Sequence, residues 1–114
     1  MQPDLAVCGG FTAWTQILAF ANAYGIATVP HVWGSGVAVA AALHAVATIP
    51  PFPHTAHPTP LLNRPVIEFD RKHNPLRDDL LAERFGLEGG SLAVPDRPGL
   101  GVTIRDDIVA RYSR

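Results

Sequence analysis

The sequence predicts an α/β fold, and within that class part of a (β/α)8 barrel. Short apolar runs alternate with helix-like stretches along the chain, and three of these runs break into loops near Asp4, His31 and Glu68. The catalytic residues of such a barrel lie at the ends of its strands, on one face. Because the chain has 114 residues and a complete barrel needs roughly 250, we expect three strands, two intervening helices and a C-terminal tail.

The first predicted elements are a strand, a helix and a second strand. Residues 5–8 are apolar and precede two glycines, which favours a short buried strand. A helix is expected over 12–23, with Thr12 as its cap and a glycine just past its end. Residues 26–30 are rich in β-branched side chains and predict a second strand that ends at His31.

The next elements are an alanine-rich helix, a loop and a third strand. The helix is expected over 37–48, beginning after Ser35 or Gly36 and stopped by two prolines. Residues 50–65 are so rich in proline that they must form an extended loop. Residues 65–69 predict the third strand, near whose end the third polar residue lies.

Beyond Asp70 the chain becomes charged and its predicted structure changes. A turn is expected at 74–78, and a hairpin is expected around Gly89-Gly90. A short extended stretch over 102–104 then leads into a terminal helix over 106–112.

Charged residues are almost absent from the first half of the chain. No Asp, Glu, Lys or Arg lies between Asp4 and Arg64. A helix without a charged face usually packs on both sides, so we expect neighbouring elements or another subunit to surround this half. The most apolar stretch, 34–49, contains His44 and is too short to span a membrane, so no membrane is expected.

The composition excludes several classes of protein. A net charge of −1 gives no electrostatic reason to expect nucleic acid as a partner. The single cysteine, Cys8, cannot form an internal disulfide and fits a reducing cytoplasm. No basic segment precedes the first apolar stretch, so a secretory signal is not expected and a cytoplasmic location is.

Asp4, His31 and Glu68 are residue types suited to proton transfer. A carboxylate that accepts the Nδ1 proton of an imidazole makes the other ring nitrogen a better base. Such a base can remove a proton from carbon beside a carboxylate if the developing charge is stabilised, usually by a metal ion. A third carboxyl group, kept protonated, can donate a hydrogen bond to that charge. The same residues also fit a plainer role, because polar residues at strand ends serve as caps and loop anchors.

Six phrases, in this order, extend the pattern over essentially the whole chain. They are Gln2-Pro3-Asp4, Cys8-Gly9-Gly10-Phe11-Thr12, Pro30-His31-Val32-Trp33-Gly34, Ile67-Glu68-Phe69-Asp70, Pro75-Leu76-Arg77-Asp78 and Pro98-Gly99-Leu100-Gly101. Together they closely resemble the C-terminal third of the enolase superfamily, in its mandelate racemase/muconate lactonizing enzyme branch. The resemblance implies the last three strands of a TIM barrel over residues 1–71. It also implies, over 72–114, a tail that returns to the capping domain.

The resemblance also assigns roles to the three polar residues. In the mandelate racemase-like subgroup the Asp and His at the sixth and seventh strand ends form the general-base dyad, and an acid at the eighth assists. Asp4, His31 and Glu68 match these positions one for one. The loop around His31 looks most like acid-sugar dehydratases and cycloisomerases of sugar-acid lactones, with a racemase left open. Trp33 would wall the sugar pocket or pack beneath the loop.

The resemblance implies a Mg²⁺ cofactor whose ligands this chain lacks. The family's three acidic ligands lie on earlier strands, and Asp4 is the only acid here before Glu68. We therefore expect the chain alone to be inactive, and to need the missing N-terminal barrel half and capping domain, or another subunit. The small-molecule substrate of the parent enzyme would be a sugar acid.

Other functions remain open at this stage. The alternative is a non-catalytic truncated or split-gene product that associates with another chain. A third possibility, behind these two, is a small sugar-binding module that needs no magnesium. A zinc site built from His31, His54, His57 and His73 is a further alternative, but their spacing matches no usual zinc motif, and solvent-exposed loop histidines fit better.

Overall fold

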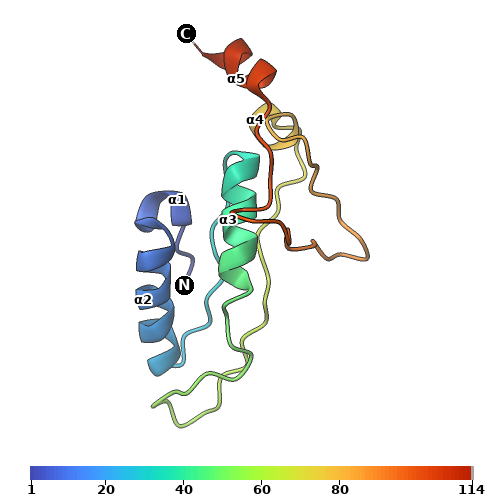
Figure 1. Cartoon of the computed structure of the whole chain (residues 1–114). Coiled ribbons are helices and arrows are strands. Elements are labelled where there is room, and N and C mark those ends of the chain that lie inside the picture. The colour runs from blue at the N-terminus through green and yellow to red at the C-terminus, as the bar shows by residue number, and fades with distance from the viewer. Residues whose placement is uncertain (114) are drawn as a thin grey trace.

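The computed structural model describes residues 1–113, which form five helices joined by long extended segments (Figure 1). The helices are α1 (Leu5–Cys8), α2 (Gly10–Ala23), α3 (Gly36–Val46), α4 (Pro75–Asp78) and α5 (Asp106–Tyr112). Within residues 1–113 no regular strand forms, and β-pairing is limited to two isolated bridges. The α2 and α3 helices run side by side, and the charged tail goes outward beyond α4, returns alongside α3 and then runs to α5 (Figure 1).

The expected strand over residues 5–8 is wrong, because Leu5–Cys8 is one turn of helix. The Asp4 side chain caps this turn by accepting from the backbone N–H of Ala6 at 2.8 Å. Gly9 closes it in the left-handed region, at φ 111°, with its N–H donating to the Leu5 carbonyl. An apolar run of four residues carries no periodicity that separates strand from helix. The extended segment therefore ends at Asp4, whose own backbone is still extended.

Residues 1–3 and 27–31 run parallel, although they form no regular strand. The Met1 amino group donates to the Ala27 carbonyl at 2.8 Å, and the Val29 N–H donates back to the Met1 carbonyl at 3.0 Å. Two residues on, the His31 N–H donates to the Pro3 carbonyl at 3.1 Å. This alternation is the pattern of a parallel ladder, which proline interrupts because it has no N–H. The second predicted strand is thus an extended segment with partial pairing.

The helices cover one side of the extended segments and leave the other side open. Thr28, Pro30 and Val32 are buried, whereas the intervening His31 is exposed, as expected for alternating side chains. The third predicted strand, 65–69, is extended and irregular, and no backbone hydrogen bond joins it to 26–31 in the described part of the chain. Its Ile67 and Phe69 side chains nevertheless pack against the helical core.

The α2 helix begins two residues before the predicted start, at Gly10, so Thr12 is not its cap. Its buried side includes Trp14, whose indole Nε1 donates to Thr48 Oγ1 at 3.0 Å. Its opposite side is bare: Phe20 is 69% exposed and Tyr24, which follows the helix, is 70% exposed. The expectation of packing on both sides is not met for α2 within this chain.

The α3 helix forms where the sequence predicts it. Ser35 caps it by accepting from the N–H of Ala38, and most of its residues are buried. The loop over 50–65 contains neither helix nor strand, as expected, and it docks on the end of α2. There the Asn63 side-chain amide donates to Asn22 Oδ1 at 3.0 Å.

The tail follows the predicted pattern closely. The hairpin around Gly89-Gly90 is present as a bridge between Glu88 and Ser91, with both glycines at positive φ as its two-residue turn requires. The stretch over 102–104 pairs with the chain near Leu81, which is 2% exposed. The terminal helix α5 forms over the predicted residues. None of the described helices is both long and apolar enough to cross a membrane.

Candidate active site

Asp4 and His31 are brought together at the ends of the two parallel segments. Asp4 Oδ2 lies 2.9 Å from His31 Nδ1, and the Asp4 side chain is 19% exposed against 47% for His31. The hydrogen bond from the His31 N–H to the Pro3 carbonyl aligns the ends of the two segments. It therefore fixes the register that places His31 beside Asp4. The predicted pairing of these two residues is therefore present.

The Asp4 carboxylate serves as an anchor as well as a partner for His31. Its Oδ1 accepts from the Ala6 N–H, and its Oδ2 accepts from His31 Nδ1. In a neutral ring this contact selects the tautomer with hydrogen on Nδ1, and it leaves Nε2 free to accept a proton. The helix cap and the contact with His31 are thus made by one side chain.

A mainly apolar cavity of about 250 Å³ lies beside the dyad. It opens between the starts of α1, α2 and α3, and Asp4, His31, Phe11 and Val37 contribute to its wall. The imidazole therefore sits between an apolar recess and solvent, where its free nitrogen is accessible.

Glu68 does not contact His31 in the structure but is held by the segment that carries Asp4. The side-chain amide of Gln2 donates to Glu68 Oε1 at 2.6 Å. Gln2 is not among the predicted site residues. The signal was present in the Gln2-Pro3-Asp4 phrase, because residues two apart in an extended segment point to the same side.

Trp33 lies on the Glu68 side of the site, and it does not line the cavity beside the dyad. Its side chain is 74% exposed and shares a small recess with Glu68 and Asn74. Of the two expectations for Trp33, packing beneath the loop is wrong in this structure.

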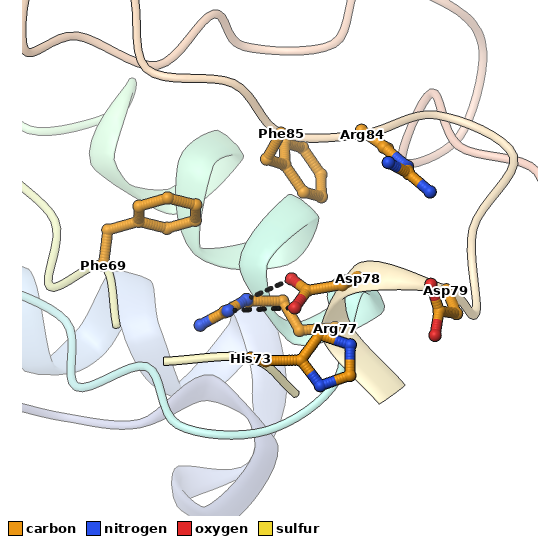
Figure 2. Close-up of a pocket in the computed structure, with 7 residues that line it drawn as sticks. All are labelled: Phe69, His73, Arg77, Asp78, Asp79, Arg84 and Phe85. Carbon is orange, nitrogen blue, oxygen red and sulfur yellow. Dashed lines mark hydrogen bonds and ion pairs between the residues drawn. The ribbon is translucent and has the colours of Figure 1, made fainter. Parts of the chain in front are cut away.

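Arg77, in α4, ties the Glu68 segment to the tail (Figure 2). Its side chain is only 9% exposed; it ion-pairs with Asp78 at 2.8 Å and stacks over the Phe69 ring at 5.5 Å from the centroid. Its guanidinium also donates to the backbone carbonyls of Asp70 and Lys72. The hydrogen bond with Asp78 raises the pKa of Arg77, and the same contact lowers the pKa of the Asp78 carboxyl.

Asn74 joins the tail to the loop that follows His31. Its side-chain oxygen caps α4 by accepting from the Leu76 N–H, and its amide donates to the Gly34 carbonyl at 3.2 Å. The short α4 segment therefore fixes the loops on which both His31 and Glu68 lie.

The described residues do not fit a Mg²⁺ site. Nowhere in residues 1–113 do three His, Cys, Asp or Glu side chains gather as a metal requires. Both oxygens of Asp4 are engaged, and Glu68 is bonded to Gln2.

Comparison with known proteins decides the family. The model of the family described as enolase C-terminal domain-like matches residues 1–108, which is nearly the whole chain. The chain belongs to the enolase superfamily. Its fold is therefore that of the enolase C-terminal domain, part of an α/β barrel, and helices outside an open inner side are what such a part presents.

Relatives of this enolase-superfamily chain act on sugar acids or their lactones. It is 42% identical over 98% of its length to a D-galactarolactone cycloisomerase from Agrobacterium fabrum. It is 34% identical over 98% of its length to an arabinonate dehydratase from Saccharolobus solfataricus. The chain covers 29% and 26% of these two relatives, respectively.

A solved structure supports the same placement. The crystal structure of the 3,6-anhydro-D-galactonate cycloisomerase from Zobellia galactanivorans matches 97% of the chain with a TM-score of 0.75 and 37% sequence identity. The chain covers 28% of that protein. The extended segments and helices described above are therefore arranged as in a known enzyme of the sugar-acid class.

Proposed function

We propose that this chain is the part of a sugar-acid enzyme that carries its general base. The enzyme would remove the proton alpha to the substrate carboxylate and then complete a dehydration, a lactone cycloisomerisation or a racemisation, which share that first step. The observation that carries the proposal is the 2.9 Å contact between Asp4 and His31 at the ends of two parallel segments. The identity to sugar-acid cycloisomerases and dehydratases supports the substrate class.

In the proposed mechanism His31 is the base and Asp4 is its partner. Asp4 holds the hydrogen on Nδ1, so Nε2 takes the proton from the alpha carbon. The imidazolium that results is stabilised by the Asp4 carboxylate beside it. Because the Asp4 carboxylate also caps α1, the backbone of α1 holds it in place, and the carboxylate in turn orients the His31 ring.

Glu68 acts from the other side of the site in this proposal. Its carboxyl group, when protonated, would donate a hydrogen bond to the negative charge that develops on the substrate carboxylate. The exposed face of Trp33 lies in the same recess as Glu68 and would form part of the wall around the sugar chain.

We place any Mg²⁺ ligands outside residues 1–113, since the described side chains form no site for the ion. The whole enzyme would then take its metal from other strands of the barrel. No step of the mechanism above is assigned to the ion.

The rest of the barrel is the partner that this proposal requires, and the chain alone should be inactive. The radius of gyration of the chain is 15.5 Å, whereas a compact domain of this length has about 13 Å. The chain is therefore more extended than an independent domain. Exposed apolar side chains such as Val7 and Phe20 are what an incomplete core leaves bare. In this scheme residues 1–71 belong to the barrel, and 72–114 form a tail that returns to a capping domain.

The same bare surface favours one alternative. A non-catalytic product that associates with another chain would also expose apolar side chains until its partner bound. The two functions differ in chemistry, because only the enzyme part needs His31 once the barrel is complete.

A graft tests the proposal directly. Residues 1–114 replace the matched region of the Agrobacterium cycloisomerase, which gives what we call the completed enzyme, and the Zobellia enzyme serves as a second host if the first graft does not fold. We expect turnover of the host's lactone or sugar acid by the completed enzyme, and none by the chain alone. Folded grafts in both hosts that turn over neither substrate would contradict the proposal.

A further inference from the structure

We propose that Gln2 is a positioning residue for Glu68: its amide holds one carboxyl oxygen and leaves the other to face the substrate. The inference rests on the function proposed above, since it concerns the carboxyl group that assists the reaction.

The contact itself links the first and third extended segments. Gln2 Nε2 lies 2.6 Å from Glu68 Oε1, across 66 positions of sequence. In a (β/α)8 barrel the inward side chains of alternate strands share one layer. In the barrel proposed above the first and third segments take the places of alternate strands, so the contact between Gln2 and Glu68 agrees with a shared layer.

The backbone fixes Gln2 more firmly than its exposed position suggests. Both of its neighbours are bonded to the second segment: Met1 exchanges two backbone hydrogen bonds with the Ala27–Val29 stretch, and the Pro3 carbonyl accepts from the His31 N–H. The register that brings His31 to Asp4 therefore also fixes the root of the Gln2 side chain.

The chemistry of the amide determines which oxygen of Glu68 can carry a proton. An amide NH₂ group only donates, so the oxygen it contacts must accept. A carbonyl oxygen accepts better than a hydroxyl oxygen, so the contact with Gln2 favours a proton on Oε2, the oxygen that Gln2 does not hold. A hydrogen-bond donor aids the reaction only if it is aimed beforehand at the atom that gains charge.

One short segment thus serves both proton-handling groups. Asp4 orients the base His31, and Gln2, two residues earlier, orients the acid Glu68. Loss of the Gln2 amide should leave substrate binding nearly intact and should weaken the step in which charge develops.

The test compares two glutamine-to-methionine variants in the completed enzyme. Gln2→Met keeps the length of the side chain and removes the donor; we expect kcat to fall about tenfold with KM changed by less than about twofold. Gln16→Met, on the exposed side of α2, is the matched control and should change neither. The melting temperatures of both variants should equal that of the parent. If Gln2→Met does not fold, Gln2→Asn replaces it, because asparagine keeps the amide but is too short to reach Glu68.

A double-mutant cycle separates positioning from a general effect. In a Glu68→Gln background, Gln2→Met should cost nothing further, because the carboxyl group that it positions is gone. An unchanged kcat in Gln2→Met, or an equal loss in both backgrounds, would overturn the inference. Failure of the proposed function is recognised separately, since Glu68→Gln alone would then leave kcat unchanged.

Discussion

Asp4 holds His31 with one carboxylate oxygen and caps α1 with the other. Oδ2 lies 2.9 Å from His31 Nδ1, while Oδ1 accepts from the Ala6 N–H at 2.8 Å. A helix cap is a rigid place from which to orient an imidazole, because backbone geometry determines where the carboxylate lies. The two roles can be separated by substitution.

Asp4→Asn should remove the dyad but keep the cap, because asparagine is as good an N-cap as aspartate. We expect kcat of the completed enzyme to fall by about 100-fold or more, as when a general base loses its orientation. The free energy of unfolding should stay within about 0.5 kcal/mol of the parent. Asp96→Asn, at an exposed position in the tail, is the control, and equal activities in the two variants would rule out the dyad.

The two tryptophans should differ in what they contribute. Trp14 is fully buried and donates to Thr48, so Trp14→Phe should lower the free energy of unfolding by about 2 kcal/mol through lost volume and loss of the indole hydrogen bond. Trp33 is 74% exposed, so Trp33→Phe should change it by less than about 0.5 kcal/mol. Urea unfolding of the completed enzyme measures both, and a larger loss for Trp33→Phe would show that the loop packs differently.

Arg77 should resist even conservative replacement. Lysine cannot reproduce a planar group that stacks over Phe69 while bonding to Asp78 and to backbone carbonyls. We expect Arg77→Lys to lower the free energy of unfolding by about 2 kcal/mol, whereas Arg64→Lys, at an exposed position, should have no effect. An Arg77→Lys variant as stable as its Arg64 counterpart would show that the stacking and the forked contacts contribute nothing.

Protonation of Glu83 at low pH should weaken the pairing between the two parts of the tail that Glu83 joins, around residues 83 and 103. The backbone N–H of Thr103, followed by the Arg97 guanidinium, lowers the pKa of Glu83 to about 2. A carboxyl whose pKa is lower in the folded chain stabilises above its unfolded value, and its contribution is lost as pH falls toward the folded value. Protection of the Thr103 amide against hydrogen exchange should therefore drop between about pH 4.5 and about pH 2.

The Glu83→Gln variant is the control for that titration. Its amide side chain does not titrate in this range, so any remaining pH dependence of Thr103 exchange would come from other groups. If the variant and the parent lost protection at the same pH, the contact between Glu83 and Thr103 would not be what protects the Thr103 amide.

The helices were predictable from sequence because their signals are local. Ser35 before an alanine-rich run, and Asp106-Asp107 opening a short polar run, mark helix starts that the structure confirms. The strand expected over 5–8 failed because four apolar residues suit either structure, and the side chain of Asp4 decided for helix. The predictions of regular strands over 26–30 and 65–69 were wrong for another reason. A regular strand needs hydrogen-bonded neighbours, and these segments have them only in part.

The site was predictable in its residues but not in its connections. Asp4 and His31 lie at the ends of extended segments, which is where a (β/α)8 barrel is expected to carry its catalytic residues. The contact of Gln2 with Glu68 joins positions 66 residues apart, which local sequence cannot relate. The contacts of Arg77 with the Asp70 and Lys72 carbonyls are short in sequence, but they reach backbone groups that no motif specifies. Only the folded chain shows that the first segment and α4 hold the segments on which His31 and Glu68 lie.

Exchange of the alpha proton of the substrate with solvent tests the central claim most directly. In D₂O, NMR of the bound or recovered sugar acid should show deuterium at the alpha carbon with the completed enzyme and with His54→Asn, which changes an exposed loop histidine. His31→Asn should abolish that exchange. Undiminished exchange in His31→Asn would contradict the assignment of this imidazole as the base.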